Sequence, residues 1–327
     1  MKVAYYPGCV AKGGAPELYR SVQCILRPLG IEAQELFDAA CTGAGVLTER
    51  NPLLADALNG RTFAMAEKRG TPVMTICSTC TGTMLACNAR LQDADYRARV
   101  NEFLAPEGLA YGGGTRIVHL LWLLVEEVGL DAVRRLVQRP LAGLRIAPFY
   151  GCYLVRPSSL TEDGHPERDT YLEQVIEALG GEPVVYSGAK KCCGFPIITF
   201  NRNNGLKLTG RRIAEAKDRG ADVMVTPSPL CHLNLDGQQA EAARALGLPL
   251  GVPILHLPQL IGLAFGFTPA QLGMSHHLVR PGSVLQRYGD GRTAGPDAAD
   301  AAPSRDGTTA AAGSDRGTRG TAQGSAR

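Results

Sequence analysis

The sequence has no long hydrophobic run and no dense block of like charges. Its most apolar stretches, 117–130 and 254–267, are short or interrupted by charged residues, whereas a bilayer span needs about 20 apolar residues. We therefore expect no membrane span. Lys and Arg number 34 against 31 Asp and Glu, a net charge of +3, and without a basic stripe we expect no nucleic-acid partner. No apolar leader follows the first residues, which predicts a cytoplasmic protein.

A further absence concerns the cysteines. Ten cysteines in a chain without a leader are typical of metal or redox ligands rather than of structural disulfides. The compact cysteine run of bacterial ferredoxins is missing. Any metal centre must therefore be built from cysteines that are distant in the sequence, and a separate ferredoxin-like partner is expected to carry its electrons.

Short apolar runs alternate with helical patterns along most of the chain. Strands alternating with helices predict an α/β fold with parallel sheets and crossover helices. The stretch 117–128, which has one broad apolar face, is predicted to be a helix. We expect a first domain at 1–141, a second at 142–282, and a disordered low-complexity tail at 283–327, because the chain from Gly289 has almost no large apolar side chains to bury.

The cysteines recur at a fixed offset in the two halves. Cys41 and Cys192 lie 151 residues apart, and so do Cys80 and Cys231. Most of these cysteines follow a predicted strand, and the carboxyl ends of parallel strands are where such sheets bind ligands. The sequence therefore predicts an internal repeat, in which two tandem Rossmann-like domains with parallel sheets are related by a pseudo-twofold axis.

Each half departs once from the shared pattern. Thr42 stands where the second half has Cys193, and Ser228 stands where the first half has Cys77. Four cysteines of the repeated pattern remain in each half. The first set is Cys9, Cys41, Cys77 and Cys80, and the second is Cys152, Cys192, Cys193 and Cys231. We predict that each set forms one ligand site, with Ser228 as a further donor at the second.

Four clustered thiolates suit either zinc or an iron–sulfur cluster. A structural zinc site usually takes two close pairs of ligands on short turns, and only Cys77 and Cys80 form such a pair here. Adjacent Cys192 and Cys193 are awkward ligands for a single tetrahedral ion and natural ligands for different irons. The sequence favours two iron–sulfur clusters, and a zinc-stabilised scaffold without a redox role is the alternative.

The cysteine motifs resemble those of the HdrB family of heterodisulfide reductase subunits, which is defined by two cysteine-rich CCG domains. They read YYPGC at 5–9, CSTC at 77–80, FYGC at 149–152, CCGFP at 192–196, CHLN at 231–234 and HLPQL at 256–260. The resemblance implies an oxidoreductase subunit that acts on disulfide or other sulfur groups within a multi-subunit complex. It also implies two partners in that complex, the ferredoxin-like HdrC and the flavin-containing HdrA.

The departures from the family pattern refine this expectation. A complete five-cysteine motif holds a noncubane [4Fe–4S] cluster in that family, and Thr42 and Ser228 each remove one ligand. The first site then implies an ordinary cubane, and the second leaves the geometry open. The thinned pattern is most similar to the short HdrB of the Hdr-like complex of sulfur-oxidising bacteria, with sulfane sulfur on a lipoate-binding protein. A CCG subunit of a lactate, glycolate or succinate oxidoreductase is the alternative.

Other residues are expected to play supporting roles. His232 follows a cluster cysteine and is expected to hydrogen bond to a cluster sulfur. His119 and His256 lie on apolar patterns and are expected to be buried core or interface histidines. Cys24 and Cys87 lie in helical stretches without counterparts in the repeat, so they are expected to be core thiols outside both sites.

Overall fold

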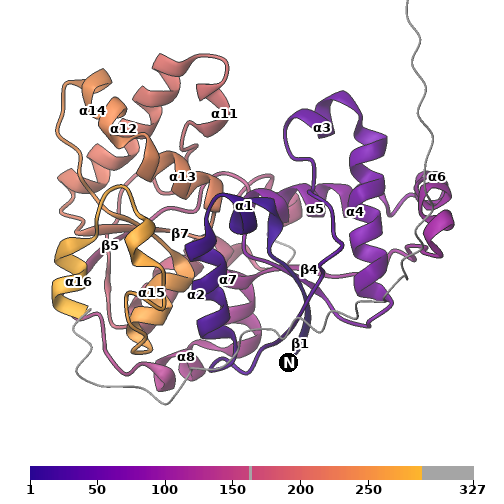
Figure 1. The fold of residues 1–327 in the computed structure, drawn as a ribbon, viewed down its shortest axis with the longest axis horizontal. Helices are drawn as coiled ribbons and strands as arrows, with labels where there is room; N and C mark the ends of the chain where they lie inside the picture. The colour runs from indigo at the N-terminus through magenta and orange to yellow at the C-terminus, as the bar shows by residue number, and fades with distance from the viewer. Residues whose placement is uncertain (162–163, 289–327) are drawn as a thin grey trace, which may run out of the picture. The chain divides into compact units, whose positions relative to one another are not determined.

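The computed structural model describes residues 1–161 and 164–288, and it confirms the predicted α/β fold with two parallel sheets (Figure 1). Of the predicted tail at 283–327, the part from Gly289 onward lies outside the described residues. The first sheet contains β1 (Lys2–Tyr6), β2 (Glu32–Glu35), β3 (Val73–Thr75) and β4 (Ile117–His119). The second contains β5 (Arg145–Pro148), β6 (Glu182–Pro183), β7 (Val223–Thr226) and β8 (Ile254–His256).

The two sheets have the same topology. Their strand orders are β2-β1-β3-β4 and β6-β5-β7-β8, and every strand pair is parallel. The match extends to register, because Thr75 pairs with His119 in the first sheet and Thr226 pairs with His256 in the second. The internal repeat inferred from the cysteine spacing is therefore a repeat of the whole sheet.

Helices cover both faces of each sheet, as crossover connections require. In the first repeat they are α1 (Gly8–Gly13), α2 (Pro16–Leu26), α3 (Val46–Arg50), α4 (Pro52–Glu67), α5 (Ser78–Arg90), α6 (Ala94–Leu104), α7 (Leu120–Leu123) and α8 (Leu130–Leu136). In the second they are α9 (Ser158–Thr161), α10 (Tyr171–Ala178), α11 (Phe195–Ile198), α12 (Arg202–Asp218), α13 (Pro229–Gly237), α14 (Gln239–Leu246), α15 (Leu257–Ala264) and α16 (Gly282–Tyr288). None of these described helices meets the length and hydropathy needed to cross a membrane.

The core lies in three layers that follow from strand alternation. Val3 and Tyr5 of β1 point into a large cluster that also contains residues of the second repeat, such as Val223 and Leu260. Ala4 and its neighbours on the opposite face of the first sheet pack in a separate cluster against α4 and α5, and a third cluster covers the matching face of the second sheet. The two repeats therefore share one buried core, and α2 of the first lies beside α15 of the second (Figure 1).

The helix predicted at 117–128 is wrong over its first residues. Ile117–His119 forms β4, α7 follows, and residues 124–128 form one π-helical turn. A short apolar run rich in β-branched residues fits either a buried strand or a buried helix, and pairing with β3 decides the outcome. The His119 ring then caps α7, since its Nδ1 accepts the Leu121 amide at 3.0 Å. The domain boundaries stay predictions. The helix α16, from Gly282 to Tyr288, runs across the predicted boundary between residues 282 and 283.

Candidate metal centres

Each set of cysteines lies at the carboxyl edge of its sheet. In the first repeat Cys9 lies in α1 after β1, Cys41 lies in the loop after β2, and Cys77 and Cys80 lie where β3 enters α5. β1 and β3 are neighbours whose connections leave in opposite directions. Such a switch point leaves a crevice between the loops, which is where open parallel sheets bind ligands.

The first site brings four sulfurs together. The Sγ atoms of Cys9 and Cys41 are 3.6 Å apart, and the Cys77 sulfur accepts the Cys80 backbone amide at 3.4 Å. The thiols of Cys77 and Cys80 also hydrogen bond to each other. Both lie near Cys9, since Cys77 raises the pKa of Cys9 electrostatically and Cys9 raises the pKa of Cys80 in the same way. The hydroxyl of Thr42 donates to the Cys80 sulfur at 3.9 Å. Thr42 therefore faces the site, where the second repeat has a cysteine.

Polar side chains hold the loop that carries Cys41. The Tyr6 hydroxyl donates to the Ala40 carbonyl at 2.8 Å, and the Asn59 amide donates to the Thr42 carbonyl at 2.9 Å. Because this loop is held on both sides of Cys41, the Cys41 sulfur stays close to the other three sulfurs of the site.

The second site repeats this arrangement around the cysteine doublet. The Cys192 thiol hydrogen bonds to Cys152 and to Cys193, and Cys193 hydrogen bonds in turn to Cys231. Backbone amides also reach both doublet sulfurs, from Gly194 to Cys192 and from Phe195 to Cys193, each at 3.4 Å. Two adjacent cysteines therefore turn their sulfurs toward one site.

Gly194 is required by the doublet turn. Its φ is +99°, and a Cβ at this position would lie 2.6 Å from the Gly205 carbonyl oxygen. Only glycine adopts that conformation at low cost and permits that approach. The Cys193 carbonyl is held by the Thr209 hydroxyl at 2.9 Å and by the Asn234 amide at 2.8 Å. The turn is therefore fixed by the backbone conformation of Gly194 and by the hydrogen bonds from Thr209 and Asn234.

A pair of glycines lets the sulfurs approach the loops after β1 and β5. Gly8 and Gly151 have φ values of +78° and +73°. A Cβ on Gly8 would lie 3.4 Å from the Cys80 sulfur, and one on Gly151 would lie 2.9 Å from the Cys231 sulfur. The two repeats thus use the same device at the same position.

Ser228 occupies the place that Cys77 has in the first repeat. Both residues precede the helix that carries the last cysteine, α13 and α5, in the N-cap position. Ser228 is 1% exposed, and its hydroxyl has no hydrogen-bond partner among the described residues. A buried hydroxyl without a partner costs free energy, so the Ser228 oxygen is suited to be a ligand of a bound group.

The thiols of each site oppose one another's ionisation. At the first site, burial and the neighbouring Cys41 raise the pKa of Cys9, and the hydrogen bond with Cys77 raises the pKa of Cys80 while lowering the pKa of Cys77. One thiol is therefore favoured as a thiolate and its neighbours are kept protonated. Four thiolates can coexist there only beside a cationic group that offsets their charge.

The second site has the same pattern. Hydrogen bonds from Cys152 and Cys193 lower the pKa of Cys192, whereas the pKa values of Cys152 and Cys193 are raised by their bonds to Cys192 and by burial. The donor set at each site, four convergent sulfurs from three separate loops, fits a four-iron cluster better than a zinc knuckle. The structure thus brings together all eight predicted cysteines, and their role as ligands stays a prediction.

One side of each site is accessible and the other is closed. Cys9 and Cys41 are exposed and Cys152 and Cys192 are half-buried, whereas the remaining four cysteines are buried. Cys87 is buried and Cys24 is half-buried, and neither joins a site; their sulfurs lie 3.8 Å from the carbonyls of Asp56 and Gln271.

The particular hydrogen bonds between the two repeats were not predicted from the sequence. His119 Nε2 lies 3.1 Å from the Pro227 carbonyl, next to Ser228, and the Ser78 hydroxyl donates to the Tyr150 carbonyl at 3.5 Å. Each repeat therefore touches the cysteine-bearing loops of the other. The signal was present, since IVHL at 117–120 and ILHL at 254–257 place a histidine at the end of the fourth strand in both repeats.

His232 does not take the expected role beside the second site. Its Nε2 lies 3.0 Å from the Ile254 carbonyl and 3.2 Å from His277 Nδ1, and its Nδ1 has no partner among the described residues. The expected hydrogen bond to a cysteine sulfur is therefore absent from the described contacts, because α13 turns this ring away toward β8. His119 and His256 are buried between the repeats, as expected.

Comparisons with known proteins agree with this architecture. The model of the CCG family, a cysteine-rich domain, matches residues 3–85 and 146–236. A solved structure of a hypothetical protein from Helicobacter pylori has the same fold, with a TM-score of 0.69 and 16% identity over 85% of this chain and 52% of its own length.

Curated relatives cover most of the chain. The "8-methylmenaquinol:fumarate reductase membrane anchor subunit" of Wolinella succinogenes is 34% identical over 84% of this chain and 96% of that protein. The HdrB component of the ferredoxin:CoB-CoM heterodisulfide reductase of Methanosarcina mazei is 29% identical over 85% of this chain and 94% of its own. An HdrB-like protein of Archaeoglobus profundus is 28% identical over 83% and 93%. The chain therefore belongs to the family of CCG cysteine-rich proteins that includes HdrB of the heterodisulfide reductases, and it carries the CCG domain twice.

Proposed function

We propose that the protein is the iron–sulfur subunit of a multi-subunit oxidoreductase and that each repeat holds one [4Fe–4S] cluster. The observation that carries the proposal is the convergence of four cysteine sulfurs from three strand ends, at matching places in two repeats. A bound four-iron cluster supplies one-electron transfer. The residues that would hold the clusters are Cys9, Cys41, Cys77 and Cys80 in the first repeat and Cys152, Cys192, Cys193 and Cys231 in the second.

The two replaced cysteines define what each site can hold. With Thr42 as a hydrogen-bond donor to Cys80, the first site has four thiolates and suits an ordinary cubane. At the second site we propose Ser228 as an oxygen donor, supported by its buried hydroxyl without a partner among the described residues. The raised pKa values of Cys9, Cys80 and Cys193 mean that loading releases protons from these thiols.

Our first candidate for the reaction is electron relay in a quinol-linked dicarboxylate oxidoreductase. The Wolinella relative, named as part of a menaquinol:fumarate reductase, supports it at 34% identity over nearly its whole length. The exposed Cys9 and Cys41 place the first site at the surface, where a partner subunit can exchange electrons with it. Four thiolates leave no ligand position for a substrate at that site.

The second candidate is a heterodisulfide reductase-like complex in cytoplasmic sulfur oxidation. Its partners would be the ferredoxin-like HdrC, the flavin-containing HdrA and a lipoate-binding protein that carries the sulfur. The HdrB relatives support it. The specific observation in its favour is Ser228 beside the Cys192–Cys193 doublet, because an oxygen ligand is exchanged more readily than a thiolate and would open one iron to sulfur.

Metal analysis tests the common core of both candidates. We expect about eight irons and eight sulfides per chain after anaerobic purification, with a brown colour that dithionite bleaches. Thr42→Cys should alter the electron paramagnetic resonance of one cluster, and Ser228→Cys that of the other. Zinc at the cysteines without acid-labile sulfide would contradict the proposal, and unchanged spectra in both variants would contradict the ligand assignment.

Turnover of the intact complex separates the two candidates. The complex purified through this subunit is supplied with reduced viologen and either fumarate or a heterodisulfide, or with oxidised viologen as electron acceptor and a sulfur-loaded lipoate protein. Reduction of fumarate alone supports the first candidate, and reaction with the sulfur compounds alone supports the second. Reaction with none of them contradicts both.

A further inference from the structure

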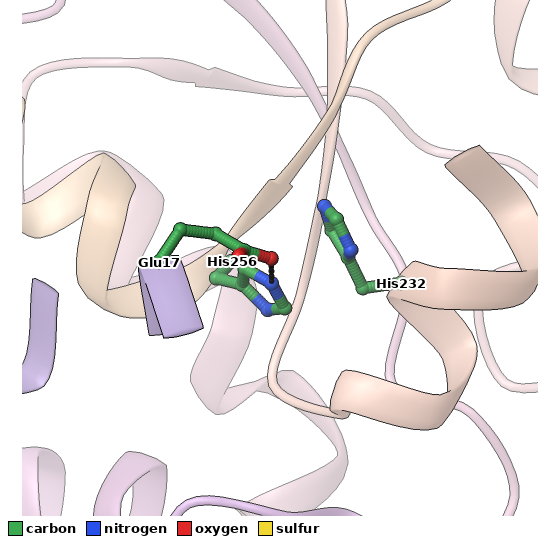
Figure 2. Close-up of side chains that lie close together, drawn as sticks. All are labelled: Glu17, His232 and His256. Carbon is green, nitrogen blue, oxygen red and sulfur yellow. Dashed lines mark hydrogen bonds and ion pairs between the residues drawn. The ribbon is translucent and has the colours of Figure 1, made fainter. Parts of the chain in front are cut away.

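A cluster of buried ionisable side chains lies at the seam between the repeats, apart from the sulfur sites. It comprises Glu17 on α2, His232 and Asp236 on α13, His256 at the end of β8, and His277 after the 3-10 turn at 274–276. Each of the five is at most 5% exposed. Figure 2 shows three of them, with Glu17 bonded to His256 and the His232 ring facing them. The clustering unites both repeats at one point.

Neither carboxylate of the cluster forms an ion pair with a lysine or arginine within the described parts of the chain. Glu17 hydrogen bonds to His256 at 3.1 Å, and Asp236 accepts two backbone amides. Two carboxylates in such a setting need a cation or a proton, because an uncompensated buried charge is costly.

Three donor atoms converge at the His277 side of the cluster. His232 Nε2 lies 3.2 Å from His277 Nδ1 and 3.0 Å from the Ile254 carbonyl oxygen, and that carbonyl also faces His277. An Asp236 oxygen and one ring nitrogen from each of His232 and His277 lie within 4.8 Å of one another. Ligands that bind one ion at about 2.1 Å are themselves about 3.3 Å apart. The two histidine rings are nearly perpendicular, at 74°, so both nitrogens can point at one centre.

A second layer of hydrogen bonds supports two of these donors, His277 and Asp236, as metal ligands require. His277 Nε2 donates to the Gln259 side-chain oxygen at 3.1 Å, which leaves Nδ1 free as a lone pair. Asp236 accepts the backbone amides of Leu278 at 2.7 Å and Val279 at 3.0 Å. Metal-binding histidines and carboxylates are oriented in this way in known sites.

The geometry excludes His256 as a ligand of the same ion. Its ring stacks on His232 at 3.7 Å between centroids and 23° between planes. An ion in the plane of the His232 ring then lies out of the His256 plane, where an imidazole has no lone pair. The Glu17–His256 pair (Figure 2) instead supplies a second negative charge beside the ion.

We propose that His232, Asp236 and His277, together with the Ile254 carbonyl, bind one divalent transition-metal ion of the zinc class. Imidazole and carboxylate donors suit zinc better than calcium or magnesium, which prefer oxygen ligands alone. The site contains no sulfur and is separate from the cysteine sites.

Metal content and zinc X-ray absorption of the full chain, with its clusters loaded, test the proposal. We expect about one zinc per chain with a nitrogen and oxygen shell. His277→Ala should lose this zinc, whereas His276→Ala, which changes the exposed neighbouring histidine, should keep it. Iron and sulfide should stay equal in all three proteins, which separates the outcome from that of the cluster proposal.

Two results would overturn the inference. One is a wild-type chain that holds no zinc and takes up no Co²⁺ after chelation; the other is zinc surrounded by sulfur. If His277→Ala does not fold, Co²⁺ titration of the chelated wild type and of His277→Gln replaces it, since thiolate ligation of Co²⁺ has its own charge-transfer absorption. A sulfur-free Co²⁺ spectrum in wild type that His277→Gln loses supports the site, and equal binding by both contradicts it.

Discussion

At the scale of single residues, the two sulfur sites differ in what takes the place of a cysteine. Thr42 offers a hydroxyl that already donates to the Cys80 sulfur, whereas the hydroxyl of Ser228 has no partner among the described residues. A donor to sulfur stabilises the reduced, more negative state of a cluster. The two proposed clusters are therefore expected to have different reduction potentials although their loops match.

Thr42→Val should make the reduction potential of the first site more negative. The change keeps the side-chain shape and removes the hydroxyl, so the reduced state loses up to about 1 kcal/mol of stabilisation. A redox titration followed by electron paramagnetic resonance measures the shift. Thr42→Ser keeps the donor and should leave the potential near that of wild type; an equal shift in both variants would rule out the hydrogen bond as the cause.

His119→Gln should weaken the loss of stability in acid. Burial lowers the pKa of His119 to about 3 from 6.5, so the unfolded chain binds a proton that the folded chain does not. The contribution of neutral His119 to the free energy of unfolding is complete above pH 6.5 and is lost as the pH falls toward 3. This loss reaches about 2 kcal/mol at pH 5.

Denaturant unfolding at pH 7.5 and at pH 5 measures this loss. The difference between the two pH values should be smaller in His119→Gln by about that amount, while His276→Gln, which changes an exposed ring, should behave as wild type. Equal losses in all three proteins would mean that His119 takes up its proton in the folded state.

The sequence predicted which cysteines meet, but not what holds their loops. The offset of 151 residues placed Cys41 with Cys80 and Cys192 with Cys231, because repeated spacing implies repeated topology. Asn59 and Asn234, which fix the carbonyls of Thr42 and Cys193, are distant in the chain from the turns they hold. Their role depends on helix packing, which no local pattern reveals.

At the scale of elements, α5 connects the two sites. Gly82 of this helix packs directly on Tyr153, the residue after Cys152. The close approach brings the helix that carries Cys80 against the loop that carries a ligand of the other site. A side chain at this position would separate them.

Gly82→Ala should destabilise the protein although alanine favours helices by about 1 kcal/mol. The new Cβ would lie 2.6 Å from the Tyr153 ring and 3.0 Å from its carbonyl oxygen, and such overpacking costs about 1–3 kcal/mol. Thermal unfolding should show a lower midpoint, and iron at the second site should fall. Gly13→Ala, which meets no atom within 4 Å, is the control; equal stability of both variants would show that α5 shifts freely.

Elements were predictable where their pattern had one interpretation. The strands ending at Tyr6 and Thr226 are bounded by turns and were recognised from short apolar runs. The strand Ile117–His119 was not, because the apolar residues of α7 continue it without a break. Only its pairing with β3 separates the two elements, and pairing is a long-range property.

At the scale of the whole molecule, the repeats are joined by polar contacts as well as by the core. Arg168 of the second repeat forms a bidentate ion pair with Glu126 of the first, at 2.6 and 3.1 Å, and lies 4.1 Å from the centre of the Trp122 ring. Both charged side chains are about nine-tenths buried. The duplicated sheets therefore depend on each other for their inner faces.

Residues 1–141 expressed alone should fail to form a stable fold, and the full chain should unfold in one transition. The fragment would expose the apolar face that includes Val3, Val22 and Trp122, which the second repeat covers in the full chain. Calorimetry of the full chain, with solubility and circular dichroism of the fragment, measures both. A soluble fragment with native-like helix content, or two separate transitions, would contradict mutual dependence and support autonomous domains.

The shared core also bears on how charge would move through the protein. Tunnelling rates fall steeply with the gap between donor and acceptor, and the shared core, which includes Tyr5 of the first repeat and Leu260 of the second, keeps the two sulfur sites in one frame. Exchange between them would need no hinge or swinging arm. Raising the solvent viscosity with glycerol should therefore slow the docking of redox partners and leave the rate of electron transfer between the two sites unaffected.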